Sequence, residues 1–125
     1  MMPSDPKKVD LSVVVPFYNE EENIARLHEA LTGVLDDLEV VSEMLFVDDG
    51  SRDTTFEICK RLAECDDRVT AIKLRKNCGQ TPAMVAGIEH ARGEVIVTMD
   101  GDLQNDPRDI KHFLEGISEG YDLVV

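Results

Sequence analysis

The hydrophobic positions of the chain fall into short continuous runs that are separated by longer segments of mixed character. The runs are rich in Val, Ile and Leu, and most show no alternation with polar residues. Continuous apolar runs of this length indicate strands that are buried on both faces, as in a parallel sheet. The five predicted strands are Leu11–Val15, Glu43–Val47, Val69–Leu74, Glu94–Met99 and Tyr121–Val125.

Between the first three runs, apolar residues recur every three or four positions, which is the spacing of amphipathic helices. The first predicted helix follows Asn19, which we expect to cap it together with Glu22 three positions later. The second is predicted to begin at Asp53. The predicted inward faces consist of Ile24, Leu27, Leu31, Val34, Leu35 and Leu38 in the first helix, and of Phe56, Cys59, Leu62 and Ala63 in the second.

Two later helices are each predicted to start with a polar cap that is followed by proline. These starts are Thr81-Pro82 and Asp106-Pro107, and Gly93 and Gly120 mark the predicted ends. The predicted inward faces consist of Met84, Val85, Ile88 and Ala91 in the third helix, and of Ile110, Phe113, Leu114 and Ile117 in the fourth.

Strands and helices that alternate in this way predict an α/β fold. We expect a mostly parallel, doubly wound sheet with helices on both faces and right-handed crossovers. Residues 1–10 are predicted to be a disordered lead-in, and residues 11–125 to belong to one domain. The sequence stops at "YDLVV", within an apolar run, whereas domain termini are usually polar and frayed. We therefore expect a fragment of a longer protein.

Charge and cysteine content narrow the function classes. The chain carries 26 acidic and 13 basic residues, a formal charge of −13, which argues against nonspecific nucleic-acid binding. No run of about 18 apolar residues predicts a membrane span, and the N-terminus lacks the apolar core of a secretory signal. The three cysteines form no C-x-x-C, and His28, His90 and His112 share no metal-ligand spacing, so we expect no zinc site. This cysteine usage is typical of a reducing cytoplasm.

Polar clusters directly follow the first, second and fourth predicted strands. They are Pro16-Phe17-Tyr18-Asn19-Glu20, Asp48-Asp49-Gly50-Ser51 and Asp100-Gly101-Asp102-Leu103-Gln104. Because parallel strands end at one edge of the sheet, and ligands of open α/β sheets bind there, we expect the clusters to meet. Their carboxylate and amide oxygens suit Mg²⁺ or Mn²⁺, which in turn can hold a diphosphate. Gly101 would allow a tight turn between two carboxylates.

Each cluster taken alone also has a purely structural interpretation as a turn or a helix cap. Two functional alternatives remain open as well. The first is a phosphoacceptor receiver domain, which also gathers acidic residues around Mg²⁺, although its acidic pair should follow the first strand. The second is a noncatalytic module that binds a nucleotide sugar or a partner protein.

Three segments together resemble the family 2 glycosyltransferases of the GT-A fold: "VVVPFYNEEENI", "FVDDGSRDTT" and "RKNCGQTPAMVAGIEHARGEVIVTMDGDLQNDP". The resemblance covers residues 11–125 and is greatest to the branch of dolichol-phosphate mannosyltransferase and bacterial polyprenyl-phosphate glycosyltransferases. It implies transfer of a sugar from a UDP- or GDP-sugar to a lipid phosphate, with inversion at the anomeric carbon. It also implies Mg²⁺ or Mn²⁺ as cofactor, and acceptor-binding and membrane-associated parts beyond Val125. We further expect a location at the cytoplasmic face of the membrane, and self-association through apolar surface that the missing part would cover.

The resemblance assigns a role to each matched position. Pro16, Tyr18 and Glu20 would line the pocket for the base and ribose, and Val47, Asp48 and Asp49 would contact the base edge. Asp100 and Gly101 would approach the ribose and diphosphate. Asp102 and Gln104 would be the metal ligands, and Asp102 would be the catalytic residue because its metal neutralises the leaving diphosphate. Arg75 and Gln80 would face the donor.

Overall fold

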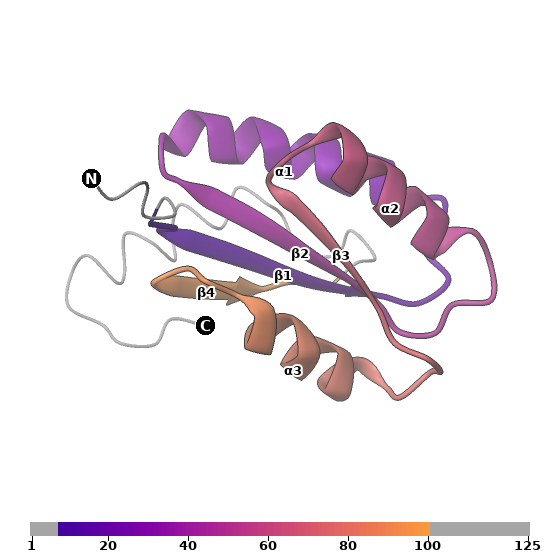
Figure 1. The fold of residues 1–125 in the computed structure, drawn as a ribbon. Coiled ribbons are helices and arrows are strands. Elements are labelled where there is room, and N and C mark those ends of the chain that lie inside the picture. The colour runs from indigo at the N-terminus through magenta and orange to yellow at the C-terminus, as the bar shows by residue number, and fades with distance from the viewer. Residues whose placement is uncertain (1–7, 101–125) are drawn as a thin grey trace.

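Strands and helices alternate along the chain in the order that the sequence predicts (Figure 1). The structure is a computed structural model, and it describes residues 8–100. The elements are β1 (Leu11–Phe17), α1 (Ile24–Leu38), β2 (Ser42–Asp48), α2 (Thr55–Cys65), β3 (Val69–Lys73), α3 (Gln80–His90) and β4 (Val95–Thr98). The predicted fourth helix and fifth strand, like the predicted lead-in up to residue 7, lie outside the described residues.

The four described strands form one parallel sheet in the order β3-β2-β1-β4. Helices α1 and α2 cover one face of the sheet, and α3 covers the other (Figure 1). The chain therefore builds the sheet outward from β1 to β3 and then returns to place β4 on the other side of β1. Such a reversal is the point at which open α/β sheets bind their ligands. The order also excludes the receiver alternative, because in that fold β1 lies between β2 and β3.

The main core lies between the sheet and the helices α1 and α2. Four residues at helical spacing on α1 are at most 1% exposed: Ile24, Leu27, Leu31 and Leu35. They face the alternate residues of β1 and β2, among them Phe17 and Phe46, whose rings meet edge to face with centroids 5.2 Å apart. Burying a side chain of this size stabilises a fold by about 1.5–3 kcal/mol. The predicted burial of Cys59 is also confirmed, at 0% exposure.

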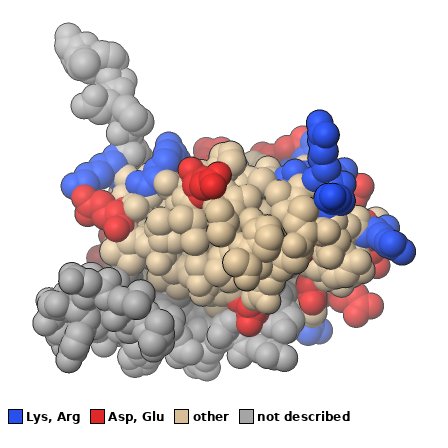
Figure 2. All heavy atoms as spheres, turned by 90° about the horizontal axis from the view of Figure 1, so that it is seen from below, with Lys and Arg blue, Asp and Glu red and all other residues tan. Residues whose placement is uncertain are grey.

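Helix α3 packs on the sheet with a different face from the one predicted. Its buried residues are Ala83 and Gly87, whereas Val85 is 45% exposed and Ile88 is 40% exposed. A Cβ atom on Gly87 would lie 2.4 Å from Cγ1 of Val14, so the helix backbone itself rests on the sheet. Small residues permit this close approach, so Val85 and Ile88 lie outside, whereas Met84 and Ala91 of the predicted face are half-buried. Among the described residues, few Lys, Arg, Asp or Glu side chains lie on this side of the molecule (Figure 2).

The predicted helix starts are displaced by one to five residues. Asn19 does not cap α1: its φ is 52°, the helix begins at Ile24, and Asn23 occupies the cap position without a side-chain capping bond. Helix α2 begins at Thr55, two residues after Asp53. Helix α3 begins at Gln80 with Gly79 at the cap position, so Thr81 does not cap it. Proline after Thr81 is still tolerated, because the first turn of a helix has no partner for its backbone N–H groups.

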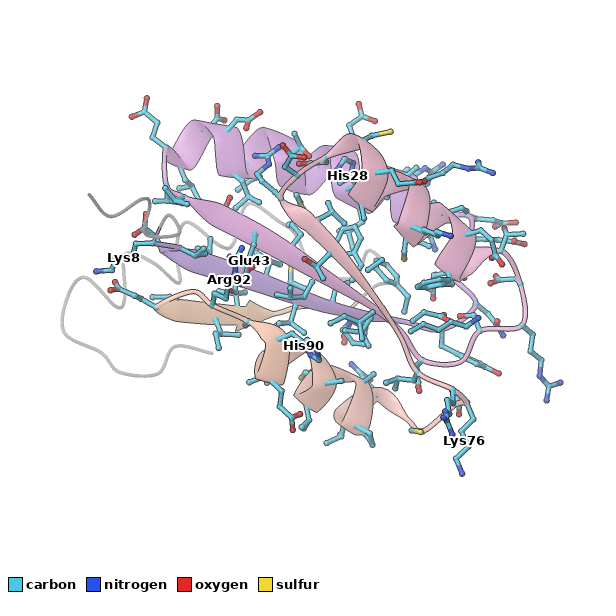
Figure 3. All side chains as sticks on the ribbon, in the orientation of Figure 1. Lys8, His28, Glu43, Lys76, His90 and Arg92 are labelled. Carbon is cyan, nitrogen blue, oxygen red and sulfur yellow. The ribbon has the colours of Figure 1, made fainter. Side chains whose placement is uncertain are left out.

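A buried carboxylate joins three elements at the amino end of the sheet. Glu43 is 4% exposed, and its Oε2 accepts hydrogen bonds from Oγ of Ser12 and from the backbone N–H of Arg92, both at 2.6 Å (Figure 3). Its Oε1 accepts a hydrogen bond of 3.2 Å from Nε of Arg92. Burial raises the pKa of Glu43, but these hydrogen bonds and the charge of Arg92 outweigh it and leave the pKa below 4.5.

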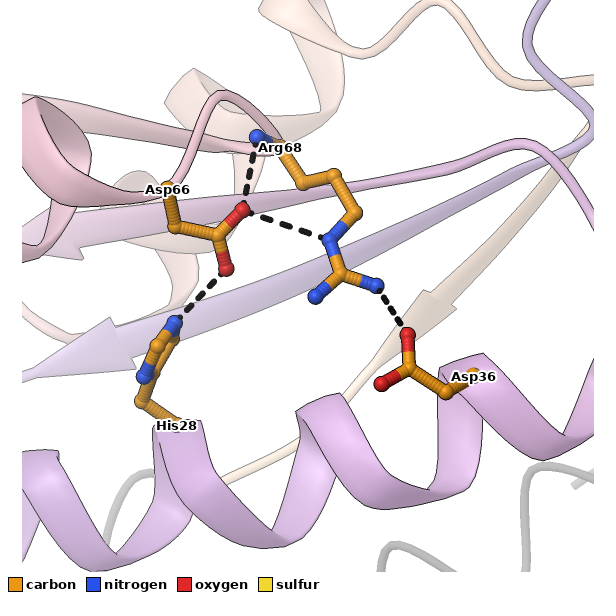
Figure 4. Close-up of polar contacts among 4 residues, drawn as sticks. All are labelled: His28, Asp36, Asp66 and Arg68. Carbon is orange, nitrogen blue, oxygen red and sulfur yellow. Dashed lines mark hydrogen bonds and ion pairs between the residues drawn. The ribbon is translucent and has the colours of Figure 1, made fainter.

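A second polar cluster joins α1 to the segment between α2 and β3 (Figure 4). Nε2 of His28 lies 2.8 Å from Oδ2 of Asp66, and Oδ1 of Asp66 accepts bonds from the backbone and side chain of Arg68. NH1 of Arg68 also bonds Asp36, at 2.9 Å. Burial raises the pKa of Asp66, but the hydrogen bonds from Arg68 and His28 outweigh it, so the pKa lies below 3.8.

Candidate functional site

A cavity of about 320 Å³ lies at the carboxyl ends of β1 and β4, where the strand order reverses. It receives residues from the ends of all four described strands. The lining residues are Pro16, Phe17, Tyr18, Glu20, Asp49, Asn77, Gly79, Gln80 and Asp100. Described residues from each of the three polar clusters therefore line one site: Glu20 from the first, Asp49 from the second and Asp100 from the third. Gly101, Asp102 and Gln104, which belong to the last of these clusters, lie outside the described residues.

The end of β1 supplies the apolar wall of the pocket. Pro16 and Phe17 are the last residues of the strand and are buried, and Tyr18 follows with 42% of its surface exposed. Glu20 adds a carboxylate, whose Oε2 accepts a hydrogen bond of 2.7 Å from Nδ2 of Asn23. An exposed aromatic ring beside an oxygen acceptor can take a flat, polar-edged group such as a nucleobase with its sugar.

Asp49 fixes a second wall of the pocket through hydrogen bonds to the segment that precedes α3. Its Oδ1 accepts a bond of 2.7 Å from the backbone N–H of Cys78, and its Oδ2 one of 3.0 Å from that of Gly79. Nδ2 of Asn77 donates to the same Oδ2 at 3.1 Å. Hydrogen bonds to an ionised acceptor are among the stronger kinds in proteins. Asp49 is only 3% exposed, so much of its bonding capacity is used within the protein.

Three loops around the pocket are also bonded to one another. We call residues 18–23, 49–54 and 74–79 the three pocket loops; they follow β1, β2 and β3. The backbone N–H of Asn19 donates to Oγ of Ser51, and the N–H of Arg52 donates back to Oδ1 of Asn19, both at 2.9 Å. The N–H of Glu20 donates to Oγ1 of Thr55 at 2.9 Å. These hydrogen bonds hold the pocket walls in place without a ligand.

Val47 and Asp48, which were predicted to contact a base, are not at the pocket surface. Both are completely buried. Val47 lies beneath Gly87 of α3, and the carboxylate of Asp48 accepts the backbone N–H of Ser51 at 3.2 Å. Their predicted contact with a base stays a prediction. Arg75 is exposed and does not line the pocket, whereas Gln80 does.

The sequence reasoning missed Phe17, Asn77 and Gly79 as pocket residues. Asn77 and Gly79 follow β3, and the third strand end was the one at which no acidic cluster drew attention. The signal was nevertheless available, because the loop after any strand of a parallel sheet reaches the same edge. Phe17 was within the quoted cluster, but no role was assigned to it.

The charge of the pocket is negative. Glu20, Asp49 and Asp100 line it, and no Lys, Arg or His among the described residues does so. Within residues 8–100 there is no group of three His, Cys, Asp or Glu side chains that could hold a metal ion. The described carboxylates therefore attract a cation but do not by themselves complete a ligand set. In the same residues, no helix has both the length and the apolar character that crossing a membrane requires.

The chain is similar in sequence to bacterial transferases. It is 41% identical over 121 residues to the undecaprenyl-phosphate 4-deoxy-4-formamido-L-arabinose transferase of Pseudomonas aeruginosa, covering 95% of this chain and 36% of that protein. It is 38% identical over 115 residues to the putative glycosyltransferase CsbB of Bacillus subtilis, covering 92% and 35%. The chain thus spans about a third of the length of these relatives.

The fold is also shared with solved glycosyltransferase structures. S. aureus TarS in complex with UDP-GlcNAc superposes with a TM-score of 0.68 at 25% identity, covering 89% of this chain and 32% of that one. The mannosyltransferase PcManGT of Pyrobaculum calidifontis, in complex with GDP-Man and Mn²⁺, gives a TM-score of 0.67 at 26% identity, covering 82% and 30%. Both are GT-A glycosyltransferases, which agrees with the parallel sheet and its pocket. Residues 12–125 match the family described as glycosyl transferase family 2, and we conclude that the chain belongs to this family.

Proposed function

We propose that this chain is the donor-binding part of a glycosyltransferase that transfers a sugar from a nucleotide diphosphate sugar to a polyprenyl phosphate. The observation that carries the proposal is the acidic pocket at the reversal of the strand order, with an apolar wall on one side. The relatives support it by their substrates: one is an undecaprenyl-phosphate transferase, and the solved neighbours bind UDP-GlcNAc or GDP-Man.

The pocket has the size and surface for the nucleoside part of such a donor. Its volume of about 320 Å³ is at the lower end of the range for small-molecule sites, roughly 300–1,000 Å³. The base would lie against Tyr18 and Pro16, and Glu20 would accept hydrogen bonds from ribose hydroxyl groups. Asp100, at the end of β4, would lie toward the ribose and diphosphate.

A divalent cation fits the residues that follow β4. Asp102 stands two residues after Asp100, so the two Cα atoms can be at most about 7 Å apart. In the proposal, Asp102 and Gln104 hold Mg²⁺ or Mn²⁺ at the acidic end of the pocket, and both offer the hard oxygen ligands that these ions prefer. The bound ion would offset the negative charge that the diphosphate acquires as leaving group.

The reaction would be a direct displacement with inversion at the anomeric carbon. A phosphate oxygen of the acceptor forms the new bond as the bond to the donor diphosphate breaks. The acceptor is already anionic, so no side chain needs to remove a proton from it. Because the proposed acceptor is a lipid, the reaction would take place at a membrane, and we propose its cytoplasmic face. Membrane association and acceptor binding would be supplied by other parts of the longer protein.

Calorimetric titration tests the donor-binding role. We expect UDP or GDP to bind in the presence of Mn²⁺ and to bind much more weakly in its absence. Asp102→Ala should abolish the effect of Mn²⁺, whereas Asp67→Ala, the same change at an exposed residue at the other end of β3, should not. Binding that does not depend on the metal, or an unchanged response in Asp102→Ala, would refute the metal site.

The noncatalytic alternative predicts a different result. Under that alternative, the longer protein would bind the nucleotide but show no sugar transfer to a polyprenyl phosphate. Transfer of radiolabelled sugar to undecaprenyl phosphate in isolated membranes separates the two.

A further inference from the structure

Gln80 connects the start of α3 to the end of β4 across the pocket. It is the first residue of α3, and its Nε2 donates a hydrogen bond to Oδ1 of Asp100. Both residues line the pocket, and they are 20 positions apart in the sequence. The contact therefore connects the start of α3 with the residue that follows β4, which are distant in sequence.

The packing of α3 on the sheet fixes the position of the Gln80 backbone. A Cβ atom on Gly87 would lie 2.4 Å from Cγ1 of Val14 and 3.1 Å from Cγ2 of Val47. The helix backbone therefore rests directly on β1 and β2. A shift of the Gln80 backbone toward or away from Asp100 would require the helix to move on the sheet, and packed interiors resist such movement.

Asp49 also restrains Gln80, through hydrogen bonds to the two residues that precede it. Its carboxylate accepts the backbone N–H groups of Cys78 and Gly79, the two residues before Gln80. Asp49 in turn is 3% exposed and follows β2 directly. A continuous set of contacts thus runs from β2 through the loop after β3 to Gln80, and from Gln80 to Asp100.

We propose that Gln80 is a positioning residue, which orients the carboxylate of Asp100 for the donor ribose and diphosphate. This inference rests on the proposed function. An amide suits the task because it donates a hydrogen bond without carrying a charge. Lys or Arg at the same place would also orient Asp100, but would cancel the negative charge that the pocket needs to attract a divalent cation.

The chemical test uses the isosteric substitution Gln80→Glu, which replaces the donor by an acceptor and places a second carboxylate beside Asp100. We expect the affinity for UDP or GDP with Mn²⁺ to fall by about tenfold or more, as is usual when a hydrogen bond to a charged group is lost. Thr81→Ala is the matched control, since Thr81 is exposed on the same turn and does not line the pocket. Its affinity should equal that of the parent chain.

A double-mutant cycle shows whether Gln80 acts through Asp100. Gln80→Ala should lower the affinity in the parent chain and change it less than about twofold in the Asp100→Ala background, because the partner is then missing. An equal loss in both backgrounds would overturn the inference, and so would a Gln80→Glu variant with the affinity of the parent.

A measurement without nucleotide separates this inference from the proposed function. In amide NMR spectra of the nucleotide-free chain, Gln80→Glu should shift the signals of Asp100 and Gly101, and Thr81→Ala should leave them in place. If the parent chain binds no nucleotide, the proposed donor role fails, and these signals alone decide the contact. Unshifted signals in Gln80→Glu would overturn it. Gln80 is exposed, so we expect both variants to keep the urea midpoint of the parent.

Discussion

Gly50 is the residue at which a single methyl group should disturb the pocket most. It has a φ of +69°, and an added Cβ would lie 2.3 Å from the backbone N of Asn77 and 2.3 Å from the carbonyl C of Lys76. The obstacle consists of backbone atoms, so no change of side-chain rotamer can relieve it. Gly50→Ala must therefore separate two of the three pocket loops or distort them.

The expected loss of stability follows from two costs. Placing a residue other than glycine in the left-handed conformation costs about 1–2 kcal/mol, and inserting a methyl group into a filled space costs about 1–3 kcal/mol. Gly50→Ala should therefore lower the free energy of unfolding by about 2–5 kcal/mol, a large share of the roughly 5–15 kcal/mol that a native domain possesses.

The same substitution at Gly33 provides the control. Gly33 lies within α1, is exposed, and has no atom within 4 Å of an added Cβ. Alanine is the better helix former by about 0.5–1 kcal/mol, so Gly33→Ala should raise the free energy of unfolding by that amount. The two substitutions are chemically identical and should act in opposite directions.

Urea denaturation followed by circular dichroism measures both effects. With a slope near 2 kcal/mol/M, the midpoint of Gly50→Ala should fall by about 1–2.5 M, and that of Gly33→Ala should rise by about 0.25–0.5 M. If Gly50→Ala unfolds at the midpoint of the parent chain or above it, the close contact between the second and third pocket loops does not exist as described.

Three further outcomes are expected. The pKa of Asp66 is lower in the folded than in the unfolded chain, so the ionised carboxylate stabilises the fold. This stabilisation is complete above the unfolded pKa of about 3.9 and is lost as the pH falls through the folded pKa. Asp66→Asn should therefore make the free energy of unfolding depend less on pH between about pH 2 and 6. Glu43→Ala should lower the free energy of unfolding by about 1–3 kcal/mol, since it leaves the buried Ser12 hydroxyl without its acceptor, and an unchanged melting curve would contradict this. Burial and the neighbouring Asp48 raise the pKa of Cys59 to about 12, so a thiol reagent at pH 8 should modify the two exposed cysteines rapidly and Cys59 only on unfolding.

The strands and the place of the pocket could be predicted from the sequence because each depends on a short-range pattern. Continuous Val, Ile and Leu runs identified β1 to β4 within two residues at each end. Once the sheet was taken as parallel, the three clusters had to share an edge, and the described residues of each cluster do so. The location of the pocket edge follows from the topology of the sheet, so it could be predicted without knowing any side-chain contact.

The inward face of α3 could not be predicted in the same way. Larger apolar residues are usually the buried ones, and this favoured Val85 and Ile88. In the structure the helix approaches the sheet so closely that only Ala83 and Gly87 fit beneath it. Which face touches the sheet depends on the distance between helix and sheet, and a helical repeat contains no information about that distance.

Adjacent carboxylates posed a similar difficulty at the site. Asp48 and Asp49 have the same side chain and stand side by side at the end of β2, and both are buried. Asp48 accepts the N–H of Ser51, whereas Asp49 lines the pocket and bonds the loop after β3. Their different roles come from partners 3 and 29 positions away. The bonds from Asp49 to a distant loop have no local sequence signature, so these partners could not be predicted even though the loop after β3 was expected at the same edge.

The mutual bonding of the three pocket loops also constrains how the proposed donor preference could be redesigned. Replacing only the loop after β2 by that of a relative with another donor would remove partners of both Asn19 and Gly79. A chimera with one exchanged loop should then lose order around the cavity without acquiring the new preference. The three pocket loops should therefore be exchanged together, with the sheet left unchanged.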